Sequence, residues 1–360
     1  MAPIKVFVTG ITGYIGGTFV NLWLNKENTV SDFSIRALVR SAAKAEQDIR
    51  PLGVEPVIGS LDDTDLLTRE AADADVVLHF ADADHLPAAK AILKGLSEPR
   101  KQGAARARPI LIHTSGTGVL TDSAYGYYAS EDIYYDNDVQ QLSTLAIEQP
   151  HRTIDLEIMS PSLVGLVDTY IVAPPTIFGC GTGPGNQNSI QIPLLVRSSL
   201  RNGQALQAGQ GLNVWNKVHV IDLAHFFVLL LERALQEPQA SGEPAVDDQG
   251  NILPELPKNL DAYWFVEDGE FAWGSVAKTI AREFVRLGIN DSGNVQDTSP
   301  EEEESIWPPN SNPGMLVGAN SRSRAVKARE ILGWEPQYHD LDGFIAEEVE
   351  RQYKDGKYNQ

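Results

Sequence analysis

The sequence predicts an α/β fold in which short parallel strands alternate with helices around one sheet. A β-branched run at residues 4–8 leads through a glycine turn into an apolar helix at residues 18–24. Further short apolar runs alternate with helical patterns along the first half of the chain, at residues 34–39, 54–58, 74–80 and 109–113. With 360 residues, 42% of them hydrophobic, the chain can bury the core of one large domain with an additional lobe.

Composition argues against several classes of function. The formal net charge of −20 disfavours nucleic acid and anionic membranes as partners. The single cysteine, Cys180, cannot form an internal disulfide and has no Cys/His cluster around it, so we expect a reducing compartment and no metal site. We find no signal-peptide pattern, and the most apolar helix, at residues 225–231, is too short to span a membrane. We therefore expect a cytoplasmic protein.

The glycine turn is the strongest functional signal in the chain. Gly10, Gly13 and Gly16 lie between a strand and a helix, which is the context that a dinucleotide-binding turn requires. The first allows a turn that a Cβ would block, the second lets the backbone approach a pyrophosphate, and the third lets the helix pack closely on the strand. The helix start offers N–H groups to the phosphates. The predicted contacts are Gly10, Thr12, Gly13, Tyr14, Ile15 and Gly16.

The pattern Thr9-Gly10-x-x-Gly13-x-x-Gly16 resembles the extended short-chain dehydrogenase/reductases, the epimerase- and dehydratase-like group. The resemblance covers nearly the whole chain and is strongest to uncharacterised fungal members, with NmrA-like proteins as more distant relatives. It implies a doubly wound Rossmann sheet with helices on both faces, a bound NAD(P) and a smaller C-terminal substrate-binding lobe. Family members often dimerise, so a homodimer is a further option.

The resemblance also implies a division of the chain. Residues 1–178 would form the NADP-binding domain, to which residues 215–235 and 262–267 return. The lobe would then consist mainly of the remaining segments, residues 179–214, 236–261 and 268–360.

Arg40 follows the second predicted strand at the position that faces the adenosine ribose in this fold. An acidic residue there would bind the 2′-hydroxyl of NAD, whereas a basic residue accommodates the 2′-phosphate of NADP. Because Arg40 stands in place of an acid, with Arg36 or Lys44 as further basic residues nearby, the sequence predicts NADP(H) as the cofactor.

Two further strand ends carry implied cofactor contacts. The resemblance places Leu61 and Asp62, which follow the strand at residues 54–58, beside the adenine, although Asp62 could also cap the next helix. The end of the strand at residues 74–80 would lie beside the pyrophosphate and ribose, with contacts from Phe80, Ala81 and Asp82.

The usual catalytic pair of this family is missing. Its tyrosine and lysine stand four residues apart on one helix, where the lysine lowers the pKa of the tyrosine and holds the nicotinamide ribose. No tyrosine between residues 125 and 135 has a lysine four residues later, and no lysine occurs between Lys101 and Lys217.

The family's catalytic hydroxyl is also displaced. The fifth predicted strand ends in Thr114-Ser-Gly-Thr-Gly118, and the hydroxyl position falls on Gly116. Ser115 or Thr117 could substitute for this hydroxyl. A tyrosine such as Tyr128 is a further candidate for proton transfer, and Thr114 is an implied cofactor contact.

The segment Gln149-Pro-His-Arg-Thr-Ile-Asp155 stands about where the missing pair would lie. His151 and Asp155 are four residues apart, so they share a helix face. His151 could act as acid/base near neutral pH, and Arg152 could replace the lysine as a cofactor contact, though not in proton transfer, because its guanidinium does not titrate usefully. The alternative is an ordinary helix start with a surface histidine and an Asp–Arg pair.

The sixth predicted strand, residues 168–173, leads into a segment that resembles the family's closure over the nicotinamide. That resemblance implies cofactor contacts from Pro174, Thr176 and Ile177. The glycine-rich loop at residues 179–186 stands where the family's substrate loops begin. Further on, the sequence predicts a strand at residues 262–266 and an amphipathic helix at residues 273–287.

Three functions fit the sequence. The first is an NADP(H)-dependent oxidoreductase acting on a small carbonyl or alcohol, with Ser115, His151 or a tyrosine handling the proton. The second is a non-redox isomerase, dehydratase or cyclase that retains the cofactor pocket. The third is a regulator that binds NADP without turnover, like the NmrA-like proteins. The glycine-rich loop and the lobe favour an enzyme with a small-molecule substrate.

Overall fold

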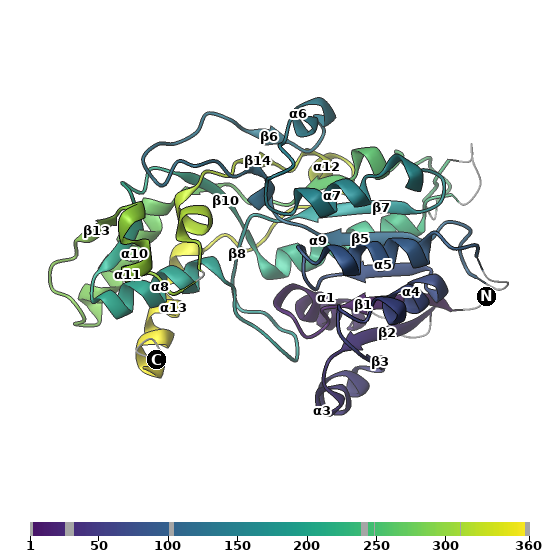
Figure 1. Ribbon diagram of the computed structural model, residues 1–360, viewed down its shortest axis with the longest axis horizontal. Helices are drawn as coiled ribbons and strands as arrows, with labels where there is room; N and C mark the ends of the chain where they lie inside the picture. The colour runs from purple at the N-terminus through teal and green to yellow at the C-terminus, as the bar shows by residue number, and fades with distance from the viewer. Residues whose placement is uncertain are drawn as a thin grey trace.

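The computed structural model describes residues 3–25, 32–100, 104–238, 244–247, 249–309 and 311–356. Its larger body is a seven-stranded sheet in the order β11-β7-β5-β4-β1-β2-β3, in which every neighbouring pair is parallel (Figure 1). The strands are β1 (Ile4–Thr9), β2 (Phe33–Val39), β3 (Glu55–Ile58), β4 (Val76–His79), β5 (Ile110–Thr114), β7 (Asp168–Ala173) and β11 (Tyr263–Phe265). The strand order runs outward from β1 in both directions, so the predicted doubly wound sheet is confirmed.

Helices cover both faces of this sheet, because each crossover between parallel strands passes over a face. One face carries α1 (Tyr14–Leu24) beside α9 (Val220–Leu235), and the other carries α4 (Thr64–Asp73), α5 (Leu86–Leu96) and α7 (Arg152–Ile158). Shorter helices lie in the connections, at α3 (Ala42–Lys44), α6 (Val139–Ser143) and α12 (Val326–Glu330). Every residue of β4, β5 and β7 is buried, as expected for parallel strands covered on both faces.

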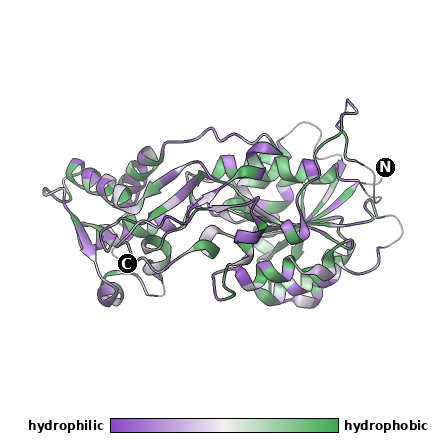
Figure 2. Ribbon diagram, turned by 90° about the horizontal axis from the view of Figure 1, so that it is seen from above, coloured by the Kyte–Doolittle hydropathy of each residue, from purple (hydrophilic) through white to green (hydrophobic). Residues whose placement is uncertain are grey.

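A smaller lobe completes the elongated molecule. Its three-stranded sheet has the order β12-β10-β8, with β8 (Thr176–Phe178), β10 (Val214–His219) and β12 (Glu270–Ala272). A second pair consists of β9 (Ala205–Ala208) and β13 (Val295–Thr298), and the helices are α8 (Gln191–Asn202), α10 (Trp273–Arg286), α11 (Glu303–Ile306) and α13 (Leu341–Asp355). The lobe has a hydrophobic core of its own, around Trp273, Phe284 and Ile345. In both bodies the apolar residues concentrate in strands and helices (Figure 2).

The segments predicted to return to the larger body go to different places. β11 joins the main sheet beside β7, and α9 packs against α1. β10 pairs with β8 and β12, so residues 214–219 belong to the three-stranded sheet and not to the main sheet. The division of the chain at residue 178 stays a prediction. Among the described residues, no helix is long and apolar enough to cross a membrane.

Candidate active site

The glycine turn packs tightly against the end of β4. Gly10 has a φ of 77°, and a Cβ on it would lie 2.7 Å from the backbone nitrogen of Ala81. A Cβ on Gly16 would lie 2.5 Å from the carbonyl oxygen of Gly10, so α1 can approach the turn only with glycine at this position. Gly13 is the N-cap residue of α1 and has no side chain to bind the first N–H groups of the helix. Those groups can therefore bind a ligand.

The surroundings of the turn fit a dinucleotide. The first turn of α1 contains no acidic residue, so its positive end is not neutralised from within the helix. The turn lies at the carboxyl edge of the sheet, where Rossmann folds bind dinucleotides. The structure brings the predicted contacts together here: Thr12, Tyr14 and Ile15 at the start of α1, and Phe80, Ala81 and Asp82 at the end of β4.

The adenosine end of this edge offers one accessible arginine. Arg40 is exposed just after β2, and we find no acidic partner for it in the part of the chain that the structure describes. Arg36, by contrast, forms an ion pair with Glu70 at 2.5 Å and lies 3.4 Å from Glu55. The prediction that Arg36 could assist at the ribose is therefore wrong, because two carboxylates already hold its guanidinium.

Asp62 is bound to the loop after β4. Its exposed carboxylate lies 3.1 Å from the Nε2 of His85, whose Nδ1 accepts the backbone N–H of Ala88. The neutral ring thus carries its proton on Nε2 and donates it to Asp62. Asp63, rather than Asp62, is the N-cap residue of α4. The adenine contacts predicted for Asp62 and the preceding Leu61 stay a prediction.

A buried polar cluster lies under the end of β5. The Ser115 hydroxyl is 2.9 Å from the Oδ2 of Asp155, and the Tyr263 hydroxyl is 2.7 Å from the same oxygen. Arg152 donates to the Tyr263 hydroxyl at 3.1 Å. All four side chains are at least 94% buried. Burial raises the pKa of Asp155 to about 6, although the hydrogen bonds from Tyr263 and Ser115 work in the opposite direction.

His151 lies beside this cluster in an unusual backbone conformation. It is the N-cap residue of α7 with a φ of 66°, which costs about 1–3 kcal/mol for a residue other than glycine. A Cβ on either Gly116 or Gly118 would lie 3.2 Å from its Nε2. The glycine that interrupts the expected hydroxyl position after β5 therefore makes room for the imidazole.

Asp84 orients the His151 ring. Its Oδ1 lies 2.8 Å from the Nδ1 of His151. Burial works to lower the pKa of His151, but the hydrogen bond and charge of Asp84 outweigh it, so that pKa is raised. The same hydrogen bond lowers the pKa of Asp84. The Asp84–His151 pair is therefore a titratable unit near neutral pH with Nε2 directed at the end of β5.

Two predicted catalytic residues are held by other groups of the protein. The Tyr128 hydroxyl is hydrogen-bonded to Asp122, and its carbonyl accepts from Asn320 at 3.2 Å. Burial and then Asp122 raise the pKa of Tyr128, which is unfavourable for a proton donor near neutral pH. Arg152 donates to Tyr263 and to the Leu142 carbonyl and is only 4% exposed. Its prediction as a cofactor contact therefore needs correction, because its guanidinium is directed into the protein.

The remaining predicted contacts form a continuous stretch at the edge. Thr114 is the last residue of β5, and the N–H of Thr117 binds the carbonyl of Pro174 at 3.0 Å. Thr176 and Ile177 follow in β8, where they pair with β10. The larger body thus continues into the lobe directly beside the site.

The glycine-rich loop closes over the outer side of the glycine turn. The Tyr14 hydroxyl donates to the Gly179 carbonyl at 2.7 Å, and the Asn186 N–H donates to the Thr12 carbonyl at 2.9 Å. A Cβ on Gly183 would lie 2.5 Å from Gly17 Cα, so the loop lies directly on α1. This contact joins the lobe side of the site to the predicted phosphate site.

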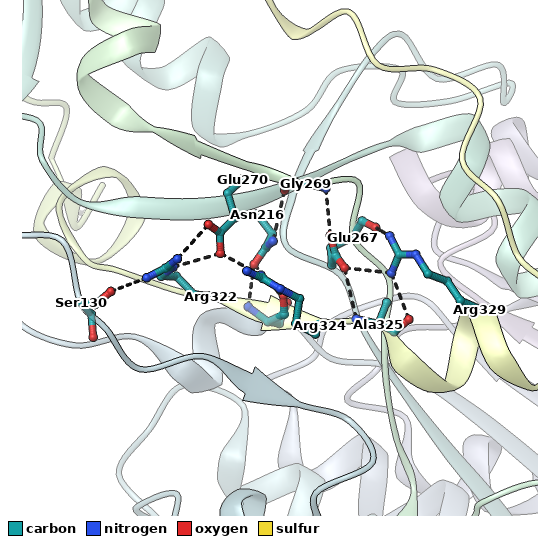
Figure 3. A network of polar contacts seen from close by, with 10 residues as sticks. Ser130, Asn216, Glu267, Gly269, Glu270, Arg322, Arg324, Ala325 and Arg329 are labelled. Atoms are coloured by element: carbon teal, nitrogen blue, oxygen red, sulfur yellow. Dashed lines mark hydrogen bonds and ion pairs between the residues drawn. The ribbon is translucent and has the colours of Figure 1, made fainter.

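A polar network fixes the loop after β5 to the lobe (Figure 3). Arg322 binds both oxygens of Glu270, at 3.0 and 2.9 Å, and the carbonyl of Ser130 at 2.6 Å. Arg324 binds the same carboxylate at 2.8 Å. Glu270 therefore binds both arginines, which hold together segments that are far apart in the sequence.

Sequence reasoning missed two members of the site. Asp84 lies in the loop after β4, where Asp82 was the expected contact, and its alignment with His151 arises only in the folded chain. Tyr263 is 108 residues from Asp155 and lies in a strand whose pattern indicates only a buried strand. No local sequence pattern identifies either residue.

Comparisons with known proteins agree with this architecture. Residues 4–95 match the model of the NmrA-like family. The protein named oxidase ucsJ from Acremonium sp is 31% identical over 96% of this chain and 98% of its own length. An uncharacterised protein of Schizosaccharomyces pombe is 28% identical over 70% of this chain and 78% of its own length.

Solved structures show the same fold. The dTDP-glucose 4,6-dehydratase DesIV from Streptomyces venezuelae, solved with NAD, has a TM-score of 0.62 at 18% identity, and the match covers 99% of this chain and 98% of that one. The UDP-glucose 4-epimerase from Thermotoga maritima has a TM-score of 0.61 at 15% identity, with 98% and 99% covered.

Proposed function

The chain belongs to the extended short-chain dehydrogenase/reductase family as an atypical member, and we propose that it is an NADP(H)-dependent oxidoreductase of a small alcohol or carbonyl compound. The observation that carries the proposal is the Asp84–His151 pair, whose ring lies against the end of β5 beside Ser115. This is the edge of the sheet at which the glycine turn lies, so a nicotinamide and a proton-transfer group can meet there.

In this proposal His151 handles the proton. When the ring is neutral and donates from Nδ1 to Asp84, its Nε2 is a lone-pair acceptor and can take the proton of a substrate hydroxyl. The resulting imidazolium is stabilised by the Asp84 carboxylate and can return the proton to a carbonyl oxygen in the reverse direction. The bound cofactor would accept or supply the hydride.

Arg40 is the proposed determinant of cofactor choice. It is exposed after β2 and free to bind the 2′-phosphate of NADP. Ser41 caps α3 beside it, and Lys44 lies at the end of this short helix as a second basic residue. The glycine turn between β1 and α1 would hold the pyrophosphate.

The relatives support an enzyme and leave the reaction as a proposal. The relative with the printed name oxidase ucsJ favours redox chemistry. The solved dehydratase and epimerase favour the second candidate, a non-redox isomerase, dehydratase or cyclase with a retained cofactor. The NmrA-like match favours the third, a regulator that binds NADP without turnover.

Two experiments on the purified protein test the proposal. Calorimetric titration with NADP, NADPH, NAD and NADH should give much tighter binding of the phosphorylated pair. Turnover of a compound from a panel of small alcohols and carbonyls should then change the absorbance of NADPH at 340 nm. Substrate conversion without net change in cofactor would support the non-redox candidate, and binding without any turnover would support the regulator. Absence of dinucleotide binding would overturn the proposal.

A further inference from the structure

We infer that Asp155, Tyr263 and Arg152 are positioning residues that hold His151 at the site, an inference that rests on the proposed role of His151. Arg152 follows His151 directly, and Asp155 lies one turn further along α7. Tyr263 comes from β11 and Ser115 from the end of β5. The cluster therefore ties the first turn of α7 to two strands of the main sheet.

The direction of every hydrogen bond in the cluster is determined by the chemistry of its members. A guanidinium only donates and an ionised carboxylate only accepts. Arg152 therefore donates to the Tyr263 hydroxyl, which donates its own proton to Asp155, and Ser115 donates to the same oxygen. With its proton committed to Asp155, Ser115 has only lone pairs left for a substrate. The chain of bonds has a single arrangement, as a rigid support requires.

The conformation of His151 requires such a support. Its φ of 66° is unfavourable for a residue with a Cβ and persists only where the surroundings determine it. Its carbonyl accepts from the N–H groups of Ile154 and Asp155, both at 3.0 Å. Its neighbour Arg152 is fixed on the other side by Tyr263 and by the carbonyl of Leu142 at 3.2 Å. Loss of the cluster would free His151 to leave the end of β5.

The electrostatic surroundings of His151 are shared among several elements. Asp84 and Asp82 face it from the loop after β4, and Asp155 faces it from α7. His113 in β5 is also close enough to interact electrostatically, and burial keeps the pKa of His113 well below its usual value. A displacement of the ring would change its distance from all of these groups and therefore its titration.

The test is the substitution Tyr263→Phe, which removes only the hydroxyl that joins Arg152 to Asp155. We expect the hydride-transfer rate to fall about 10–100-fold, as for loss of orientation, with KM within about twofold. The ring signal of His151, identified by its absence in His151→Gln, should titrate at a pH shifted from that of the parent protein. This NMR measurement needs no substrate, so it can support or overturn the inference even if the proposed function fails.

The matched control is Tyr170→Phe. Tyr170 is fully buried in the neighbouring strand β7, and its hydroxyl has no hydrogen-bond partner among the described residues. Loss of this hydroxyl should leave both the rate and the titration of His151 unchanged. If Tyr263→Phe behaves like Tyr170→Phe in both measurements, the inference is overturned while the proposed role of His151 stands.

A double-mutant cycle separates positioning from general stability. In a His151→Gln background, Tyr263→Phe should have no further effect on the rate, because the group it positions is gone. An equal loss in both backgrounds would contradict positioning through His151. Asp155→Asn gives a second test through the rate alone, with the same expected loss, because this variant also removes a charge that raises the pKa of His151.

Discussion

The glycine turn and the start of α7 lie at the same edge of the sheet but are built in different ways. In the turn, backbone meets backbone: a Cβ on Gly10 or Gly16 would come within 2.7 Å of main-chain atoms. At the start of α7, side chains from β5, β11 and the loop after β4 meet around His151 and Asp155. A site made by close backbone approach constrains residue types at fixed spacing, whereas a site made by distant side chains leaves no local pattern.

The largest expected effect is at the start of α7, where the site is made of side chains. His151→Gln should lower turnover about 100–10,000-fold, as expected for loss of a general acid/base, while dinucleotide affinity stays unchanged. Steady-state kinetics and calorimetry on the same variant measure both quantities.

The control is His339→Gln, because His339 lies in the lobe segment and forms a similar pair with Asp268 at 2.8 Å. A large loss of turnover in both variants, or a loss of cofactor binding in His151→Gln, would contradict a role in proton transfer that is confined to the start of α7.

This difference also decides how much the sequence could predict. The strand–glycine–helix pattern at residues 4–24 predicted the turn and the kind of sheet that it belongs to, because local backbone geometry dictates those residues. The absence of the family's catalytic tyrosine and lysine could also be read directly from the sequence. Only half of the group that we propose in their place could be predicted: the segment from His151 to Asp155 was identified, but Asp84 and Tyr263 come from elements that meet only through the sheet topology.

The prediction for Arg152 shows the same limit. Its position in the sequence matches the lysine of the family, and its charge fits a cofactor contact. The direction of its side chain depends on the start of α7 and on Tyr263 in β11, and the structure turns it inward. Counting along the chain locates a residue on an element but does not determine which way its side chain points.

The next largest effect is at the glycine turn, where the site is made by close backbone approach. Gly10→Ala should weaken dinucleotide binding by about 100-fold or more, equivalent to about 2.7 kcal/mol, because the new Cβ adds a clash with β4 to the strain of a positive φ. Calorimetry gives the affinity, and far-ultraviolet circular dichroism shows whether the fold is retained.

Gly53→Ala is the matched control for the strain alone. Gly53 has a similar φ of 76°, but a Cβ on it would meet nothing within 4 Å. Equal losses of binding in Gly10→Ala and Gly53→Ala would show that close packing at the turn is not what the site requires.

A smaller effect is expected at Arg40, the side chain that we propose as the determinant of cofactor choice. Arg40→Ala should weaken NADPH about 10–100-fold, as for loss of a hydrogen bond to a charged group, and leave NADH unchanged. Arg36→Ala serves as the comparison, because Glu70 and Glu55 already hold that guanidinium. Equal losses for NADPH and NADH in Arg40→Ala would reject the assignment of cofactor choice to this residue.

The pH dependence of turnover tests the role of Asp84 beside His151. In the direction of alcohol oxidation His151 must be neutral, so the rate should rise with pH through its raised pKa. Asp84→Asn removes the group that raises this pKa, and the rise should therefore move to lower pH, with the maximal rate reduced severalfold. A pH–rate profile that stays in place would show that Asp84 does not set the titration of His151.

The smallest effect is on stability, and it arises from the buried carboxyl of the side-chain site. The pKa of Asp155 is raised by burial from its ordinary value of 3.8 to about 6, so the folded state binds its proton more tightly than the unfolded state does. This group therefore makes the protein more stable at pH 4 than at pH 7, by about 1–3 kcal/mol. The stability is lost as the pH rises between those two pKa values.

In Asp155→Asn that part of the pH dependence should disappear. The similar contribution of Asp136, whose pKa burial also raises to about 6, should remain. Urea unfolding at pH 4 and pH 7 measures the difference. If the parent protein and Asp155→Asn lose equal stability over this range, the pKa of Asp155 is the same in the folded and unfolded states, and the hydrogen bonds from Ser115 and Tyr263 offset its burial.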